Sequence, residues 1–272
     1  MKTKKSIRYY AEKGQPIENA FIIDFHGHIG PYRAFYNPGV SADDLLAMMD
    51  RMGIDMSVQF SNAVMSSDHV LGNKAVKEVS DLYPDRIIPF AAVNPRYPEE
   101  ASNELKYYCG ECGWKGIKIH PSGNNYPVNG KLYAPIWEFA AEHSRVVISH
   151  SWDEPTCNAL AFDEVATNYP DVTIVLAHCI MPDFKGAVEL ALKHPNIYLE
   201  LTAAAPLNGL IEWMTETIGV DKIIYGSDLG GWFSPGHGMG PILYADIPDD
   251  DKCKILGANA AKILKINEIN RN

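Results

Sequence analysis

The stretch Ile22-Ile23-Asp24-Phe25-His26-Gly27-His28 joins a short apolar run to two histidines. On a β-strand, side chains two residues apart point to the same face, so His26 and His28 can converge on one point near the strand end. Converging imidazoles are what a metal ion needs from a protein. The Gly-x-Gly-x-x-Gly turn of an open dinucleotide-binding sheet does not follow this strand. The stretch therefore favours a closed barrel over an open doubly wound sheet.

The rest of the chain alternates between short β-branched runs and longer segments of helical periodicity. The predicted strands are 21–25, 56–60, 87–93, 116–119, 146–149, 173–177, 197–201 and 222–225. The predicted helices are 41–52, 70–83, 99–111, 132–143, 158–169, 184–194, 207–218 and 250–264. Eight such units in about 250 residues predict an α/β fold, the (β/α)₈ TIM barrel. We expect an N-terminal extension over 1–20, the barrel over 21–266, a C-terminal tail over 267–272 and a glycine-rich loop over 236–240.

Composition narrows the class of protein. The chain has 272 residues, of which 46% are hydrophobic, and a formal net charge of −10, which argues against nucleic-acid binding. No apolar run approaches the roughly 20 residues that span a bilayer, and the N-terminus lacks the apolar core of a secretory signal. Five scattered cysteines predict reduced thiols and a cytoplasmic location. We expect a small-molecule substrate and no membrane partner, with a homodimer as the commonest kind of oligomer.

Polar side chains recur where the predicted strands end, and active sites of barrels lie at those ends. The metal-capable residues in these positions are His26, His28, His120, His150, His178 and Asp228. Their coincidence at matching positions predicts a metal site.

Successive side chains of a strand point alternately into and out of a barrel. In the predicted strands this alternation turns Asp24, Lys118 and Glu200 toward the barrel axis. An inward lysine must be neutralised. We therefore expect Lys118 to pair with Asp24 or Glu200, or to carry a carbamate that bridges two metals.

These strand ends resemble those of the amidohydrolase superfamily, and most closely its amidohydrolase-related branch. The resemblance extends from Phe21 to about Leu264. Its carriers are His26-Gly27-His28, the Gly116–Pro121 segment, His150, His178, the Tyr225–Asp228 segment and the Gly257–Ala261 segment.

The resemblance implies that a divalent metal, zinc by expectation, is held by His26, His28, His150 and Asp228. It also implies that His178 orients or deprotonates the metal-bound water, or polarises the substrate. In two-metal relatives a carbamylated lysine stands where Lys118 stands; we expect one metal. His120 matches no general ligand of the superfamily.

Three functions remain open at this point. The first is a hydrolase of a small amide, ester or lactone, in which zinc lowers the pKa of its water to about 7 and Asp228 moves the proton. The second is a metal-dependent, non-oxidative decarboxylase of a small aromatic or unsaturated acid. The third is a non-catalytic binding protein. The compact length favours the hydrolase. Substrate contacts are expected from loop and strand-end residues, namely Arg33, His120, Trp152 and Trp232.

Overall fold

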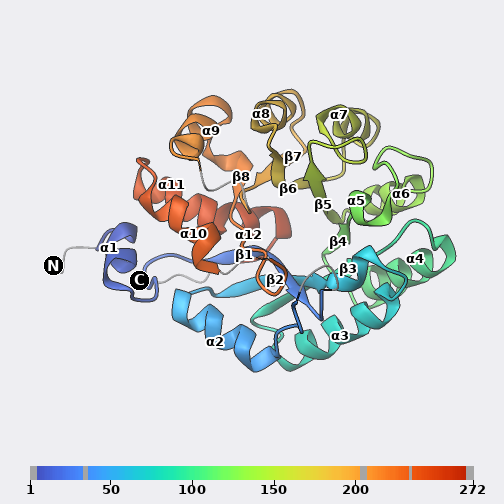
Figure 1. Cartoon of the computed structure of the whole chain (residues 1–272), viewed down its shortest axis with the longest axis horizontal. Helices are drawn as coiled ribbons and strands as arrows, with labels where there is room; N and C mark the ends of the chain where they lie inside the picture. Colours follow the sequence, from blue (N-terminus) through green and yellow to red (C-terminus); the bar gives the residue numbers. More distant parts are fainter. Residues whose placement is uncertain (1–4, 33–35, 203–206, 233–234, 268–272) are drawn as a thin grey trace.

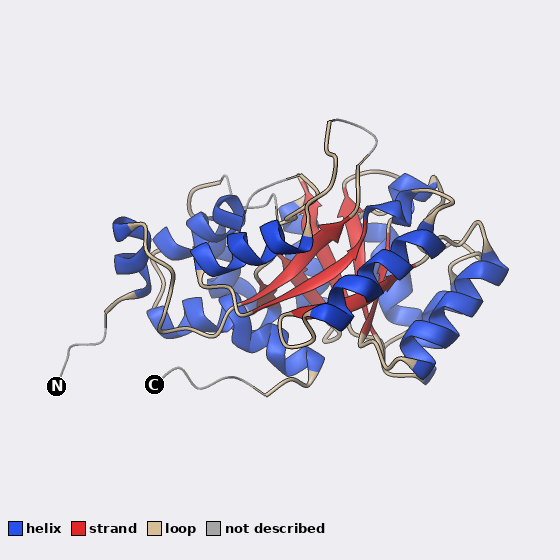
Figure 2. Ribbon diagram, turned by 90° about the horizontal axis from the view of Figure 1, so that it is seen from below, coloured by secondary structure: helices blue, strands red, loops and turns tan. Residues whose placement is uncertain are grey.

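Eight parallel strands follow one another around a barrel in the order of the chain, and helices surround them (Figures 1 and 2). The computed structural model describes residues 5–32, 36–202, 207–232 and 235–267. The strands are β1 (Ile23–Ile29), β2 (Met56–Ser61), β3 (Ile87–Ala92), β4 (Gly116–Ile119), β5 (Val146–Trp152), β6 (Ile174–Met181), β7 (Ile197–Glu200) and β8 (Ile223–Ile224). The predicted (β/α)₈ barrel is confirmed. However, β1, β5 and β6 extend past their predicted ends, so several site histidines lie within strands.

The barrel closes where the segment that follows β8 meets β1. Phe25 N donates to Tyr225 O at 3.0 Å, and Asp228 N donates to His26 O at 2.7 Å. His28 N donates to Leu229 O at 2.6 Å. These backbone bonds hold the segment that carries Asp228 against the segment that carries the two histidines, although the two are about 200 residues apart in sequence.

Helices occupy the connections between the strands, and side-chain caps hold the starts of two of them. The Ser41 hydroxyl accepts from Asp44 N at 3.1 Å, and Asn158 Oδ1 accepts from Ala161 N at 3.0 Å. The main helices are α1 (Ile7–Lys13), α2 (Ala42–Met52), α3 (His69–Leu82), α4 (Pro98–Glu104), α5 (Pro121–Asn124), α6 (Ala134–Glu142), α7 (Ala159–Asn168), α8 (Phe184–Lys193), α9 (Leu210–Ile218), α10 (Pro235–Tyr244), α11 (Asp249–Cys253) and α12 (Asn259–Leu264).

Shorter helical segments connect these helices and strands. They are η1 (Asn62–Met65), η2 (Leu105–Glu111), η3 (Val220–Lys222) and η4 (Lys254–Ala258). The predicted loop over 236–240 is wrong, because those residues form the first turns of α10. There α10 contacts α1 on the outside of the barrel.

Apolar side chains fill the lower part of the barrel interior. The inward set includes Phe25, Phe60 and Phe90, which are fully buried, and the rings of Phe25 and Phe90 meet edge to face at 5.7 Å. A separate, larger apolar cluster lies between the strands and the surrounding helices. This packing leaves only the carboxyl end of the barrel for polar side chains, which is where barrels carry their active sites.

The described part of the chain contains no helix that is long and apolar enough to span a bilayer. No two cysteines of the described chain are joined by a disulfide.

Candidate metal centre and active site

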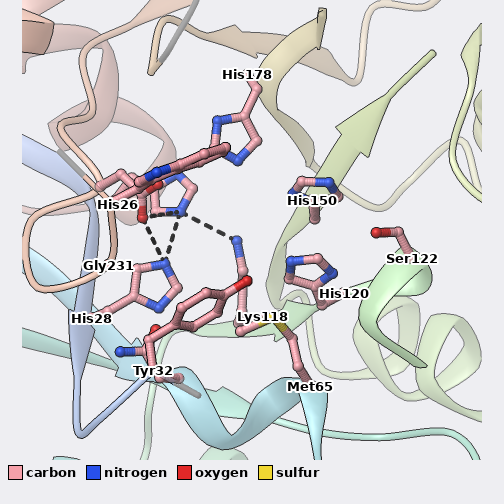
Figure 3. Close-up of a pocket in the computed structure, with 13 residues that line it drawn as sticks. His26, His28, Tyr32, Met65, Lys118, His120, Ser122, His150, His178 and Gly231 are labelled. Atoms are coloured by element: carbon pink, nitrogen blue, oxygen red, sulfur yellow. Dashed lines mark hydrogen bonds and ion pairs between the residues drawn. The ribbon is translucent and has the colours of Figure 1, made fainter. Parts of the chain in front are cut away.

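A cavity of about 300 Å³ opens at the carboxyl ends of the strands (Figure 3). Most of the predicted site residues line it. The described lining residues are His26, His28, Tyr32, Asn62, Met65, Lys118, His120, Ser122, His150, His178, Asp228, Gly231 and Trp232. A larger cavity of about 520 Å³ adjoins it, and Tyr32, Asn62 and Met65 line both.

Three potential metal-ligand atoms converge on one side of the cavity. His26 Nε2 lies 3.2 Å from His28 Nε2 and 3.6 Å from Asp228 Oδ1, and His28 Nε2 lies 2.9 Å from the same carboxylate oxygen. All three residues are buried. Two imidazole nitrogens and a carboxylate oxygen at this spacing form a donor set that suits a divalent cation.

A second carboxylate, Glu200, lies behind the first histidine. Glu200 Oε2 is 2.9 Å from His26 Nδ1, and its other oxygen accepts hydrogen bonds from the backbone N and the hydroxyl of Thr202. Burial raises the pKa of Glu200 to about 8, against the Thr202 hydrogen bonds and the charge of Lys118. A carboxylate that orients a metal-binding imidazole is a common second layer of a metal site. Sequence alternation turned Glu200 inward but did not reveal this role.

A bulge in β1 lets Phe25 and His26, which are neighbours in sequence, both face the barrel interior. The pairing of β1 with β2 shifts register between Asp24 and Gly27. Phe25 therefore packs inside the barrel below, while His26 and His28 face the cavity above.

Asp24 does not lie next to Lys118 as alternation suggested. It accepts hydrogen bonds from Ser227 N at 2.9 Å and from the Ser227 hydroxyl, as well as from His26 N at 3.1 Å. Burial raises the pKa of Asp24 to about 7. Asp24 thus fixes the backbone on which His26 and Asp228 stand, and the predicted ion pair between it and Lys118 is wrong.

Lys118 is fully buried in the cavity floor. Its Nζ lies 3.4 Å from His26 Nε2 and 4.4 Å from the centre of the Phe60 ring. Within the described chain, no carboxylate oxygen lies within ion-pair distance of this nitrogen, so the predicted pairing with Glu200 is also absent. Burial lowers the pKa of Lys118 to about 8, although the charges of Asp228 and Glu200 oppose the shift. Since an ammonium group only donates, this contact leaves His26 Nε2 as the acceptor.

His178 reaches the cavity through an unusual backbone. His178, Cys179 and Ile180 all have positive φ, at 67°, 50° and 55°. Such backbone angles cost free energy for residues other than glycine, and especially for a β-branched isoleucine. Along β6, Ala177 packs in the interior, and the left-handed backbone after it turns His178 into the cavity. His178 Nδ1 lies 3.3 Å from the carbonyl oxygen of Thr202, which therefore accepts a hydrogen bond from that nitrogen.

His150, His120 and Trp152 form a stack of rings beside His178. His150 lies parallel to His120, with ring centres 4.0 Å apart, and parallel to Trp152 at 5.8 Å. The nitrogen atoms of His150 belong to another group of potential ligands, with Glu154 and Cys157, and not to the group formed around Asp228. Trp152 is not among the described cavity-lining residues, and Arg33 lies outside the described residues.

The histidines of the cavity favour the neutral form. Burial lowers the pKa of His178 to about 4, although the charge of Asp228 opposes the shift. Burial also lowers the pKa values of the other four imidazoles, those of His26, His28, His120 and His150. For Asp228, burial raises the pKa, but the hydrogen bond from His28 and nearby positive charge, including that of Lys118, outweigh it and leave the pKa below its usual value. Neutral imidazoles beside an ionised carboxylate are the protonation states that bind a metal ion.

Sequence reasoning missed several lining residues. Tyr32, Asn62, Met65 and Ser122 follow β1, β2 and β4 in loops and short helices at the carboxyl end of the barrel. Asn62 Nδ2 donates to Gly30 O at 2.7 Å and so ties two of these loops together. The histidines were selected because they follow predicted strands and can bind a metal. These four residues also follow strands, but their side chains are not typical metal ligands, so position alone did not single them out.

Solved structures with the same fold are decarboxylases of aromatic acids, among others. A 2,6-dihydroxybenzoate decarboxylase bound to 2,6-dihydroxybenzoate has a TM-score of 0.73 at 16% identity, with 91% of this chain and 100% of that one covered. A 5-carboxyvanillate decarboxylase from Sphingomonas paucimobilis has a TM-score of 0.72 at 16% identity, with 91% and 100% covered. A dihydroxybenzoic acid decarboxylase from a Polaromonas species, with manganese and the inhibitor 2-nitroresorcinol, has a TM-score of 0.71 at 17% identity, with 93% and 99% covered.

These relatives contradict the prediction of a hydrolase, which the compact length of the chain favoured. They are decarboxylases, the reaction that sequence analysis kept as the alternative. The matches cover nearly the full length of these decarboxylases, so the similarity extends over the whole barrel. Together with the converging ligand atoms, the manganese-bound relatives support a divalent metal.

No curated protein sequence matches the chain significantly. The family model of the amidohydrolases (Amidohydro_2) matches residues 23–266, which is the whole barrel. This protein belongs to the amidohydrolase family.

Proposed function

We propose that this protein is a metal-dependent, non-oxidative decarboxylase of a small aromatic or unsaturated carboxylic acid. The observation that carries the proposal is the convergence of His26 Nε2, His28 Nε2 and Asp228 Oδ1 at the floor of a cavity of about 300 Å³. That volume is at the lower end for small-molecule sites. The similar decarboxylase structures support the reaction class.

His26, His28 and Asp228 would hold one divalent ion, with His150 as the further ligand that the family resemblance implies. The donor set suits zinc, the ion expected from the sequence, and manganese, the ion in a similar structure. A bound ion of either kind would supply Lewis-acid chemistry, which stabilises negative charge on a substrate carboxylate.

Decarboxylation replaces the carbon–carboxylate bond by a carbon–hydrogen bond, so one proton must reach the carbon that releases CO₂. We assign this proton transfer to Asp228, because its carboxylate lies at the cavity floor beside both histidines and is ionised at neutral pH. It takes a proton from solvent or from a substrate hydroxyl and passes it to the carbon.

His178 would act beside Asp228. Its Nδ1 donates to the Thr202 carbonyl, so its Nε2 carries a lone pair that can accept a hydrogen bond from the substrate or from water. Tyr32, Met65 and Trp232 supply the apolar lining for a flat ring.

The test is CO₂ release by protein loaded with manganese or zinc, using a panel of hydroxybenzoates, other aromatic acids and unsaturated acids, with lactones alongside. We expect stoichiometric CO₂ and loss of acid for at least one member, and no release by EDTA-treated protein. Ring opening of a lactone without CO₂ release from any acid would overturn the proposal. Metal analysis of the same sample should give about one ion per chain; two would make a carbamylated Lys118 the bridge.

A further inference from the structure

His120 is a cavity residue that the proposed chemistry leaves without a role. It follows β4 and forms the N-cap of α5, and its ring stacks on His150 at 4.0 Å with an angle of 8° between the planes. Figure 3 shows the ring beside Lys118, next to His150 and on the side of the cavity that carries Ser122. Stacking and capping together fix both the plane and the rotation of this imidazole.

A backbone hydrogen bond determines which of its nitrogens carries the proton. Gly123 N donates to His120 Nδ1 at 3.0 Å, so Nδ1 must present a lone pair. The ring is therefore neutral and carries its hydrogen on Nε2. Glycine at 123 permits this approach, because a Cβ there would lie 2.5 Å from Met65 Cγ and 3.0 Å from Nδ1 itself.

The Nε2–H group is available to a ligand. Among the described residues no hydrogen-bond partner lies at Nε2, and this atom is not one of the buried polar atoms left without a partner. Since the residue lines the cavity, the accessible face of Nε2 is the cavity face. A neutral N–H donor held in a fixed direction costs little entropy when a ligand uses it.

The position of this donor relative to the metal ligands follows from the ring contacts. His26 contacts His178 at 5.1 Å between ring centres, His178 contacts His150 at 5.0 Å, and His150 contacts His120 at 4.0 Å. Along this path two rings, those of His178 and His150, lie between His120 and His26. Figure 3 shows Ser122 on the same side of the cavity as His120, and Lys118, whose Nζ lies 3.4 Å from His26 Nε2, between His120 and His26. The Ser122 hydroxyl and the Lys118 ammonium can both donate hydrogen bonds. This end of the cavity is therefore suited to an oxygen that accepts hydrogen bonds.

We propose that His120 is a specificity-determining residue, which donates from Nε2 to a ring hydroxyl or phenolate oxygen of the substrate, distinct from the carboxylate that is lost. The inference rests on the proposed function in one respect, that the ligand is an aromatic acid. It narrows the substrate to hydroxylated aromatic acids. A site built to hydrogen-bond an oxygen rejects the analogue that lacks it.

Two substitutions distinguish the roles of the two nitrogen atoms of His120. His120→Asn keeps an acceptor near the position of Nδ1, and asparagine is among the best N-cap residues, so α5 should persist while the Nε2 donor is lost. His120→Gln places an amide N–H near the position of Nε2 and removes the cap. His143→Asn is the matched control, because His143 is exposed at the end of α6.

The measurement is the dissociation constant of metal-loaded protein for benzoate and for 2-, 3- and 4-hydroxybenzoate, by calorimetry. Wild type should bind at least one hydroxybenzoate about tenfold more tightly than benzoate, the ratio that one good hydrogen bond gives. His120→Asn should reduce that ratio to near one, with less than a twofold change for benzoate and with unchanged metal content. His120→Gln should keep part of the ratio, and His143→Asn all of it.

Equal losses for benzoate and the hydroxybenzoates in His120→Asn would overturn the proposal, since they indicate a structural role alone. Wild type that binds none of these acids, or all of them equally, would overturn it as well. The measurement does not depend on turnover. A hydroxyl preference that needs His120, without CO₂ release from any acid, would refute the decarboxylase and leave this inference standing.

Discussion

Glu200 and His26 form a buried carboxylate–imidazole pair, with Oε2 2.9 Å from Nδ1. The two residues are on β7 and β1, and neither would be paired with the other from sequence. A cation at Nε2 favours the state in which Nδ1 holds the proton and Glu200 is ionised. The pair therefore links the orientation of His26 to metal binding.

Glu200→Gln should weaken metal binding by about 10- to 100-fold, the usual effect of removing a carboxylate behind a metal-binding histidine. The amide keeps the side-chain size, so the fold should persist. Titration of EDTA-treated protein with manganese or zinc measures the effect. Glu104→Gln is the control, since Glu104 accepts from Asn73 at 2.8 Å away from the cavity. Equal affinities in the two variants would show that the pair has no influence on the metal.

Asp228→Asn should leave metal bound but lower turnover by orders of magnitude, because the proton carrier is lost. Asparagine tolerates the φ of 60° at this position as well as aspartate does, so backbone strain should not change. Metal content and kcat are measured on the same preparation, with the exposed Asp221→Asn as control. Near-normal kcat would remove Asp228 from the role assigned to it.

Gly226→Ala should lower both stability and metal affinity. A Cβ at 226 would overlap Glu200 Oε1 and lie 2.8 Å from the His26 Cβ, so the pair must move. Gly240→Ala in α10 is the control. Its Cβ would meet nothing within 4 Å, and alanine in a helix is more stable than glycine by up to about 1 kcal/mol. Urea unfolding of both variants tests the contrast. A Gly226→Ala protein as stable as wild type would indicate that Glu200 can shift freely.

Metal-free protein should lose stability as the pH falls from 6.5 toward 4. The pKa of His178 is about 4 in the folded protein and about 6.5 when unfolded, so in this range the unfolded chain takes up the proton first. The contribution of His178 to the free energy of unfolding is fully present above pH 6.5 and falls by up to about 3 kcal/mol as the pH reaches 4.

His178→Asn removes this titration while tolerating the positive φ of the position. Urea midpoints of EDTA-treated wild type and variant at pH 7 and pH 5 provide the comparison. Wild type should lose more stability than the variant between the two. An equal loss would show that His178 is not held neutral by the fold.

The amino-acid sequence by itself determined the barrel and the height of the site within it. Both depend on local periodicity, and the strand from Gly116 to Ile119 agrees with its predicted bounds. Ser41 fixed the start of α2 because capping is a local interaction. The strand-end histidines were found because barrels bring the ends of all their strands to one face.

Tertiary structure decided how those residues meet. The bulge between Asp24 and Gly27 and the left-handed backbone at His178 both break the alternation from which side-chain directions were predicted. Such breaks are stabilised by partners distant in sequence, such as Ser227 for Asp24, and leave no local pattern. For the same reason the sequence could not place Glu200 behind His26 or fix the proton of His120. These contacts are set by closure of the barrel, which joins segments that the chain keeps far apart.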